Sequence, residues 1–207
     1  MKKEVITISC GIGRSFEETV AAMRIAKKIK GEEKYNIKIY KGERLRSKLH
    51  EVFKQRAKEY FELSNALTND QKKILENFSL RDPLTGLLNK IGFVLKLEEL
   101  KRLGINSGYY ILFDLDDLHY WNQKIGYSKV DKYIEEIGKV IISNIRQRDN
   151  KLMSDLVGHR LNESAGDEFL IFIPSEESKE KLEKIKTMTK RIIDKINEAQ
   201  LKIPKTL

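Results

Sequence analysis

Carboxylates stand beside two apolar runs of this 207-residue chain, a pattern that suits metal-dependent chemistry. Asp114 follows the run Tyr109–Phe113, and Asp167 and Glu168 come directly before a second run farther along the sequence. If the two runs are neighbouring strands of one sheet, these three side chains converge at one point. Mg²⁺ is typically held by one or two carboxylates together with the phosphates of a substrate. The pattern therefore predicts phosphoryl or nucleotidyl transfer with bound divalent ions.

The acids that follow Asp114 have a simpler interpretation. Asp116 and Asp117 come just after the same run, and exposed acids often do no more than cap a strand end or a turn. We expect this structural role for these two residues. For Asp114, Asp167 and Glu168 taken together, we expect the chemical role.

The charge balance favours an anionic partner without saying which. Lys and Arg number 40 against 31 Asp and Glu, so the net charge is +9. The single cysteine, Cys10, excludes a disulfide within the chain, and the three histidines are too widely spaced for a zinc site. No apolar run is long enough to cross a bilayer, no signal-peptide core follows Met1, and aromatic residues are not interleaved with a basic stripe. We therefore expect a cytoplasmic protein that binds neither membranes nor nucleic acid.

Runs rich in β-branched and aromatic residues predict the strands that would carry the acids. They are Val5–Cys10, Ile37–Tyr40, Tyr109–Leu115, Leu156–Leu161 and Phe169–Ile173. From Tyr109 onward the order is strand, helix, strand, tight turn, strand, helix, which is one strand short of a ferredoxin-like unit. Residues 201–207 are too few to supply that strand. We therefore expect it to come from elsewhere in the chain.

Apolar stripes at helical spacing predict the helices between these strands. One helix begins at the capping box Ser15–Glu18, and stripes over 130–145 and 182–196 indicate two more. A further stripe over 45–63 is followed by a capping box at Thr68–Gln71. This helical pair separates a small N-terminal β-α-β unit from a larger α/β region.

Several motifs, in their order along the chain, resemble those of the GGDEF family of diguanylate cyclases. They are Arg81-Asp-Pro-Leu-Thr-Gly-Leu-Leu-Asn89, Phe113-Asp-Leu-Asp116, the set Asn122, Gly126 and Asp131, and Ala165-Gly-Asp-Glu-Phe169. The resemblance implies an α+β fold, a ferredoxin-like palm whose antiparallel sheet is flanked by helices. It also implies GTP as substrate, Mg²⁺ or Mn²⁺ as cofactor, cyclic di-GMP as product and a homodimer for catalysis.

The resemblance assigns the metal-binding and catalytic roles residue by residue. The carboxylates of Asp114, Asp167 and Glu168 and the backbone carbonyl of Leu115 match the metal ligands. Asp167 also matches the residue that activates the ribose 3′-hydroxyl, and Glu168 assists it as the adjacent signature acid. His119 stands where the family usually has a lysine, so it belongs to the catalytic set, with a charge that changes near pH ~6.5.

The resemblance also assigns guanine recognition, to Asn122 and Asp131. An acidic side chain can accept hydrogen bonds from guanine N1–H and N2–H₂, a donor pair that adenine lacks. The alternative for both residues is that they merely cap the following helix. Their joint occurrence at the family spacing favours guanine recognition.

The N-terminal segment resembles the last part of a GGDEF domain. The matching pieces are Val5–Gly13, Ile25–Lys28 and Asn36–Tyr40. We therefore expect a circular permutation in which residues 1–42 supply the fourth core strand, its helix and an edge strand. Residues 43–78 then form a helical connector, and 79–207 form the main part of the domain. In this arrangement Lys27 becomes the lysine that contacts the triphosphate, and Gly11-Ile-Gly13 is not a dinucleotide-binding loop.

Some positions depart from the family pattern. Ala165 replaces the first glycine of the signature, and the segment before it, residues 158–164, is longer than is usual in the family. Leu152 stands where the product-inhibition motif, which ends at Asp155, needs an arginine, so we expect no feedback inhibition there. These departures leave two alternatives open. One is a catalytically degenerate domain that binds GTP or a cyclic dinucleotide as a regulator, and the other is a related palm polymerase that makes another cyclic or oligonucleotide messenger.

Overall fold

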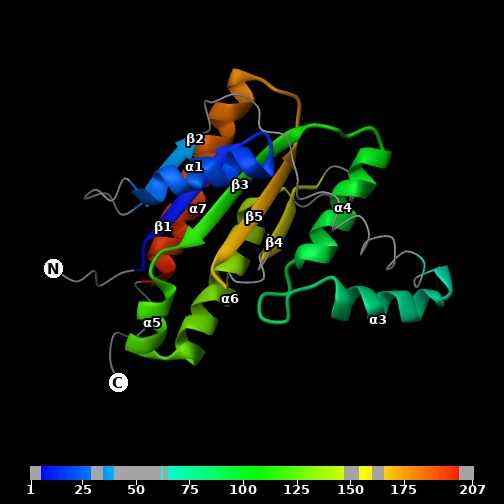
Figure 1. The fold of residues 1–207 in the computed structure, drawn as a ribbon, viewed down its shortest axis with the longest axis horizontal. Helices are drawn as coiled ribbons and strands as arrows, with labels where there is room; N and C mark the ends of the chain where they lie inside the picture. The colour runs from blue at the N-terminus through cyan, green and yellow to red at the C-terminus, as the bar shows by residue number, and fades with distance from the viewer. Residues whose placement is uncertain are drawn as a thin grey trace.

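Strand β3 (Gly108–Leu115) runs through the middle of a five-stranded sheet of order β2-β1-β3-β5-β4 (Figure 1). The computed structural model describes residues 6–28, 35–39, 62, 65–146, 154–159 and 166–200. The other strands are β1 (Ile8–Gly13), β2 (Tyr35–Ile39), β4 (Leu156–His159) and β5 (Glu168–Pro174). The described helices are α1 (Phe16–Lys28), α3 (Asn69–Ser79), α4 (Lys90–Arg102), α5 (Leu118–Ile125), α6 (Tyr127–Asn144) and α7 (Lys179–Gln200).

Four strands of the sheet form an antiparallel array. β1 pairs with β3, β3 with β5 and β5 with β4, all antiparallel, whereas β2 runs parallel to β1 at the edge. The missing strand of the C-terminal region is therefore β1, which pairs with β3 from Ile8↔Leu115 to Gly13↔Tyr110. This arrangement confirms the predicted α+β fold with an antiparallel sheet flanked by helices.

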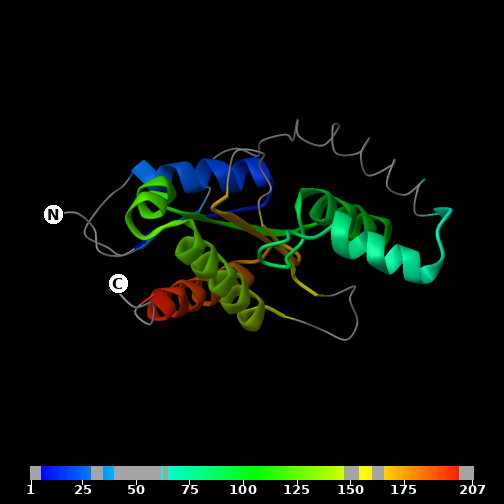
Figure 2. The ribbon, with the colours of Figure 1, turned by 90° about the horizontal axis from the view of Figure 1, so that it is seen from below.

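Helices cover both faces of the sheet, with α1 and α4 on one face and α6 and α7 on the other (Figure 2). Successive side chains of a strand point to opposite faces, and β3 follows this rule. Ile111 and Phe113 pack in the larger core, which includes residues of α6 and α7, whereas Leu112 packs with residues of α1 and α4. Asp114 therefore emerges on the face that α1 covers.

The predicted helical stripes are borne out where the structure describes them. The stripe over 130–145 lies on α6 and its C-cap residue, the stripe over 182–196 lies on α7, and their apolar residues are buried in the larger core or packed against it. The Thr68–Gln71 capping box is formed, because the Thr68 N–H donates to Gln71 Oε1 at 3.0 Å and the Gln71 N–H donates to Thr68 Oγ1 at 3.4 Å. Of the stripe over 45–63, all but residue 62 lies outside the described residues.

Helix α4 was not expected from the apolar spacing. Its N-cap is Asn89, whose Oδ1 accepts a hydrogen bond from the Gly92 N–H at 3.0 Å. Gly92 lies against the chain before the helix, where an added Cβ would stand 2.2 Å from the Leu80 carbonyl oxygen. None of the helices in the described parts of the chain has the length and apolar character needed to cross a membrane.

The first strand differs from the prediction, because β1 covers Ile8–Gly13 rather than Val5–Cys10. The strand extends through the glycines because α1 packs closely against them. A Cβ added at Gly11 would lie 2.2 Å from the Thr19 carbonyl oxygen and 2.5 Å from the Met23 nitrogen. Gly11 thus serves helix–strand packing. In addition, β2 begins at Tyr35, the described part of β4 ends at His159, and β3 and β5 each begin one residue earlier than predicted.

Candidate active site

The predicted acids lie where β3 ends and the antiparallel strand β5 begins. Asp114 is opposite Glu168 in the antiparallel register of these two strands. The Leu115 N–H donates a hydrogen bond to the Asp167 carbonyl oxygen at 3.2 Å. The sheet therefore brings Asp114, Leu115, Asp167 and Glu168 to one place, although 52 residues separate Asp114 from Asp167 in the chain, between positions 114 and 167.

Asp114 is a buried carboxyl group, with 3% of the residue exposed. Burial raises its pKa to about 7, and the charges of Asp167 and Glu168 act in the same direction, while Lys27 opposes them. One pKa unit corresponds to about 1.4 kcal/mol, so the raised pKa means that ionising Asp114 in the folded protein costs substantial free energy. A nearby cation would stabilise the ionised form of such a carboxyl group.

The cation beside Asp114 in this structure is Lys27, in the last turn of α1. Its Nζ lies 2.5 Å from Asp114 Oδ1, and its side chain is 39% exposed. Partial burial acts to lower the pKa of Lys27, but the hydrogen bond and the charge of Asp114, with smaller contributions from Asp167 and Asp116, raise it above the ordinary value. Lys27 therefore stays charged and offsets part of the repulsion among the acids.

Asp116 has the structural role that the sequence favoured. Thr7 Oγ1 donates to Asp116 Oδ2 at 2.7 Å, and Ser9 Oγ donates to Asp116 Oδ1 at 3.0 Å. The Asp116 N–H also donates to the Thr7 carbonyl oxygen at 2.9 Å. These contacts tie the end of β3 to the start of β1. Asp117 next to it adopts a left-handed conformation with φ of 60° at the N-cap of α5.

The acids fit a divalent ion that shares its ligands with a substrate. Within the described residues, no group of three or more His, Cys, Asp or Glu side chains is arranged to hold a metal by itself. The donors at the strand ends are nonetheless hard oxygens, and burial, with the nearby charges of Asp167 and Glu168, raises the pKa of Asp114, so a bound cation would favour its ionised form. Mg²⁺ commonly binds through one or two carboxylates plus phosphates, with water in the remaining positions. The residues present suit that mode rather than a cage made only of protein ligands.

The predicted guanine-binding residues lie on two consecutive helices. Asn122 is near the end of α5 and Asp131 is in α6, and Gly126 joins the two helices with φ of 85°. Asn122 Oδ1 is buried and has no hydrogen-bond partner among the described residues, so it is an available acceptor. Asp131 is partly exposed. The placement is compatible with a ligand held at the α5–α6 corner.

The predicted catalytic His119 lies on the exposed side of α5. Its Nε2 is 2.8 Å from Nε2 of Gln123, one turn farther along the helix. Trp121 is buried, stands edge-on to Tyr120 with ring centroids 5.4 Å apart, and has Lys124 Nζ 5.0 Å from its ring centroid. The aromatic pair therefore anchors α5 to the core and leaves His119 on the outer surface.

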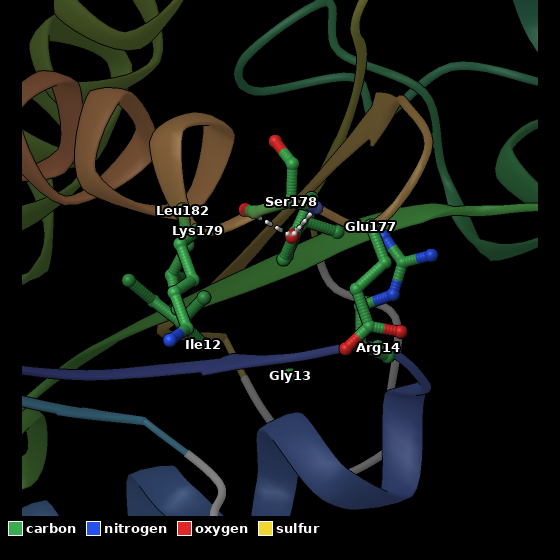
Figure 3. Close-up of a pocket in the computed structure, with 8 residues that line it drawn as sticks. Ile12, Gly13, Arg14, Glu177, Ser178, Lys179 and Leu182 are labelled. Atoms are coloured by element: carbon green, nitrogen blue, oxygen red, sulfur yellow. Dashed lines mark hydrogen bonds between the residues drawn. The ribbon is translucent and has the colours of Figure 1, made fainter.

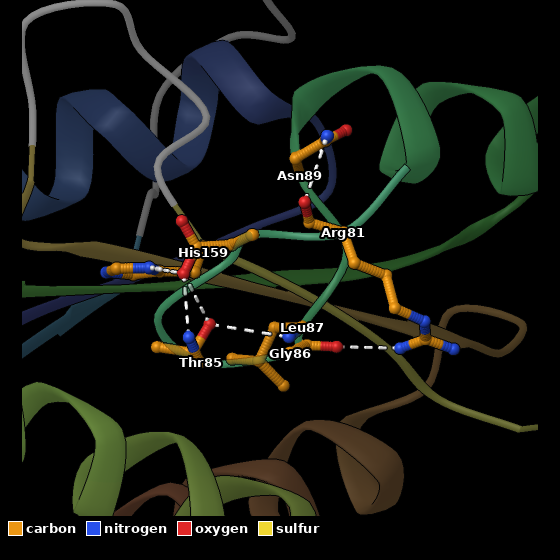
Figure 4. Close-up of polar contacts among 7 residues, drawn as sticks. Arg81, Thr85, Gly86, Leu87, Asn89 and His159 are labelled. Carbon is orange, nitrogen blue, oxygen red and sulfur yellow. Dashed lines mark hydrogen bonds and ion pairs between the residues drawn. The ribbon is translucent and has the colours of Figure 1, made fainter. Parts of the chain in front are cut away.

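The segment 81–89 forms a tight loop that is fixed to β4 (Figure 4). Asp82 accepts hydrogen bonds from the Thr85 N–H and Oγ1, both at 2.9 Å, and its Oδ1 lies 3.0 Å from Nδ1 of His159. Asp82 and His159 are both buried, with 3% and 0% exposed. The sequence singled out the loop but assigned no role to His159, because a lone histidine carries no local pattern.

A separate small pocket (Figure 3) is lined by Tyr109, near the start of β3, whereas Asp114 lies near the end of that strand. It has a volume of about 170 Å³. Its lining consists of Ile12, Gly13, Arg14, Tyr109, Glu177, Ser178, Lys179 and Leu182. The Arg14 guanidinium stacks 4.4 Å from the Tyr109 ring centroid, and the Tyr109 hydroxyl donates to the Ser178 carbonyl oxygen at 3.2 Å. None of the predicted site residues lines this pocket.

Asp155, where the product-inhibition motif would end, is part of a buried ion pair. Arg146 Nη2 donates to Asp155 Oδ1 at 2.7 Å, and the Arg146 N–H donates to Oδ2 at 3.0 Å. The Asp155 side chain is 1% exposed. This pair connects the residues just after α6 with those just before β4, while Leu152 lies outside the described residues.

The comparison with known families identifies the chain. Residues 79–206 match the family described as "Diguanylate cyclase, GGDEF domain", which is more than half of the sequence. The chain belongs to the GGDEF family. The match begins at the end of α3 and covers the strands and helices that carry the acids and the α5–α6 corner of this GGDEF domain.

Solved structures of GGDEF proteins resemble the chain in part. The diguanylate cyclase SiaD from Pseudomonas aeruginosa, solved with its activator SiaC, is 25% identical with a TM-score of 0.43, and the match covers 69% of this chain and 49% of that one. The coiled coil and GGDEF domain of DgcB from Caulobacter crescentus, solved with c-di-GMP, is 17% identical with a TM-score of 0.45, covering 68% and 67%. The match thus spans about half the length of the SiaD chain. No curated protein is significantly similar to this sequence.

Proposed function

We propose that this GGDEF domain is a nucleotidyl cyclase that condenses two molecules of GTP into cyclic di-GMP. The supporting observation is the buried carboxyl group of Asp114, opposite Glu168 in the sheet and beside a charged lysine. Two copies of the chain, each holding one GTP, meet as a homodimer. Each ribose 3′-hydroxyl attacks the α-phosphorus of the other GTP, a phosphodiester bond forms, and pyrophosphate leaves.

Each residue of the acid cluster has a proposed task in this reaction. Asp114, Asp167, Glu168 and the Leu115 carbonyl would hold Mg²⁺ or Mn²⁺ ions, together with the phosphates of GTP. When bound, these ions stabilise the charge on the attacking and leaving oxygens. Asp167 accepts the proton of the 3′-hydroxyl, and Glu168 assists it. His119, on the exposed side of α5, takes the place of the family's usual lysine in the catalytic set.

Asn122 and Asp131 orient the nucleotide by its base. The Asp131 carboxylate accepts from guanine N1–H and N2–H₂, and the Asn122 amide completes the recognition. Lys27 binds the triphosphate, since a lysine is a common point-charge ligand of phosphate. In the structure Lys27 pairs with Asp114, and a bound nucleotide would offer it the phosphates as an alternative partner.

We also propose that the domain is circularly permuted. Residues 1–42 provide β1, α1 and β2, residues 43–78 are the helical connector, and residues 79–207 are the main part. The position of β1 between β2 and β3 supports this division, because the family match starts only at residue 79 and the N-terminal strand still completes its sheet. The permutation also explains how a lysine from residues 1–42 reaches Asp114.

A second function is favoured by a specific observation. Lys27 already pairs with Asp114, and this buried acid therefore has a cation beside it without a metal ion. A degenerate domain that binds GTP or a cyclic dinucleotide as a regulator, without turnover, would have these properties. Ala165 in the signature and His119 in place of the usual lysine agree with that alternative.

The deciding experiment incubates the purified chain with Mg²⁺ or Mn²⁺ and with GTP, ATP or both, and identifies the products by mass spectrometry. We expect cyclic di-GMP from GTP alone, and no product from Asp167→Asn. The same change at Asp194, an exposed residue of α7, is the matched control and leaves the yield unchanged. Tight binding of GTP without product would replace the cyclase by the regulator, and a product containing adenine would replace it by another messenger synthase.

A further inference from the structure

His159 is a fully buried histidine at the last described position of β4, next to the signature. In the β4–β5 ladder it is paired with Phe169, the residue that directly follows Asp167 and Glu168. Its ring lies against the Phe169 ring with centroids 4.4 Å apart and a tilt of 31°. The side chain therefore packs on the residue that anchors the signature acids to the sheet.

The orientation of the His159 ring is set by Asp82. Hydrogen bonds from His159 and Thr85 hold the pKa of the Asp82 carboxyl well below its usual range, despite the opposing effect of burial. Asp82 is therefore an anion that can only accept hydrogen bonds, so Nδ1 of His159 carries the proton of their 3.0 Å contact. The bond fixes both the rotamer of the imidazole and its proton on Nδ1.

Main-chain hydrogen bonds attach the same loop to β4. The His159 N–H donates to the Leu88 carbonyl oxygen at 2.9 Å, and the Leu88 N–H donates to the Val157 carbonyl oxygen at 3.2 Å. Thr85 stabilises the loop from within through its two bonds to Asp82. The loop that carries Asp82 therefore hydrogen-bonds to one edge of β4, and β5 pairs with the other edge of β4.

We infer that His159 is a positioning residue, which transmits the fixed geometry of the 81–89 loop to the acids Asp167 and Glu168. The contact runs from Asp82 through the imidazole to Phe169. Because Asp114 faces Glu168 across the β3–β5 ladder, a small displacement of Phe169 changes the spacing of the carboxylates proposed to bind metal. This inference rests on the proposed metal-dependent function, but its first test does not need turnover.

A histidine that only packs in the core would respond differently to substitution. Replacing it would lower the stability of the fold and leave metal affinity and kcat unchanged in the folded fraction. Partners that orient metal ligands from outside the coordination sphere typically change metal affinity or activity by about 10–100-fold when they are removed. The two roles are therefore separable by measurement.

The experiment compares three variants of the full chain with the native protein. His159→Phe keeps a ring on Phe169 and removes the donor to Asp82, whereas His159→Asn keeps a donor close to the position of Nδ1 and removes the ring. Leu156→Ala, a buried change on the same strand farther from the signature, is the control for lost stability. For each variant we measure Mn²⁺ affinity by electron paramagnetic resonance, kcat and KM for GTP, and Tm.

We expect His159→Phe to weaken Mn²⁺ affinity and kcat by about 10-fold or more, with little change in KM. His159→Asn should recover part of this loss, and Leu156→Ala should lower Tm only. If His159→Phe does not fold, Asp82→Asn, which removes the anion and keeps the shape, gives the same comparison.

The outcomes separate this inference from the proposed function. Native Mn²⁺ affinity and kcat in both His159→Phe and Asp82→Asn would overturn the positioning role and leave the cyclase intact. If His159→Phe weakens Mn²⁺ affinity while the native protein itself makes no cyclic di-GMP, the positioning role is upheld and the cyclase is overturned. A native chain that binds no Mn²⁺ would overturn both.

Discussion

Lys27 of α1 and Asp114 of β3 form an ion pair in which Nζ and Oδ1 are 2.5 Å apart. The acid is buried and the lysine is partly exposed, so the lysine can leave the carboxylate and enter solvent while the acid cannot. Lys27 thus stands at the boundary between the acid cluster and the outside. This relationship connects the N-terminal segment with the chemistry of the strands that follow much later in the chain.

Lys27→Met should weaken the binding of Mg²⁺–GTP by about 10–100-fold. A hydrogen bond to a charged group contributes about 1.5–3 kcal/mol, and methionine keeps the stem while it removes the charge. Isothermal titration calorimetry measures the change. The neighbouring Lys28 is exposed, and Lys28→Met should bind GTP like the native chain. Equal affinities for the two variants would remove Lys27 from the triphosphate site.

Asp114→Asn should stabilise the fold at pH 8 more than at pH 5. The folded pKa of Asp114, about 7, lies above its unfolded value of about 3.9, so the native state holds the extra proton between these limits. The stability of the native chain therefore falls as the pH rises through this window, whereas asparagine does not titrate.

Thermal unfolding at the two pH values checks this prediction. About 1 kcal/mol corresponds to roughly 2–4 °C in a chain of this size, so we expect a gain in Tm of several degrees at pH 8. Asp194→Asn, at an exposed position of α7, should show the same Tm difference from native at both pH values. A variant that is less stable than the native chain at pH 8 would contradict the assigned cause.

Asp131→Ala should remove discrimination between GTP and inosine triphosphate, which lacks the guanine 2-amino group. The native chain should prefer GTP by about 10-fold or more, because a charge-assisted hydrogen bond to that group is lost with inosine. Competition binding with both nucleotides measures the ratio. Glu136 is an exposed residue of the same helix that pairs with Lys139 at 2.7 Å, so Glu136→Ala should keep the native ratio. A ratio near one in the native chain would exclude Asp131 from base recognition.

Reversal of the permutation should preserve the fold. A chain in which residues 79–207 come first and residues 1–42 follow after a flexible linker keeps every strand pairing of the sheet. We expect cooperative unfolding and native GTP affinity, measured by denaturant titration and calorimetry. Residues 79–207 alone should not fold cooperatively, because β3 would lose its pairing with β1. Independent folding of that fragment would show that residues 1–42 are not part of the domain.

Local patterns in the sequence determined the elements and the kind of chemistry. Apolar spacing identified α6 and α7, a capping box identified the start of α3, and the acids next to apolar runs indicated the metal-binding region. Apolar spacing did not predict helix α4, because its buried side chains are divided between two small clusters and form no single stripe. The sequence did not predict that β1 extends to Gly13, because glycines are weak strand formers. The close packing of α1 explains why glycines stand in this strand.

The tertiary structure decided which side chains meet. The resemblance to the GGDEF family predicted Lys27 at a triphosphate, but its ion pair with Asp114 depends on α1 packing on β1 and on β1 pairing with β3. The Asp82–His159 contact likewise joins a loop to a strand far along the chain, and neither residue lies in a pattern that predicts the other. Short-range periodicity specifies helices and strands because it reflects the geometry of one segment. Contacts between distant segments are set by the packing of the whole sheet, and in this protein they determine the charge and the position of the acids.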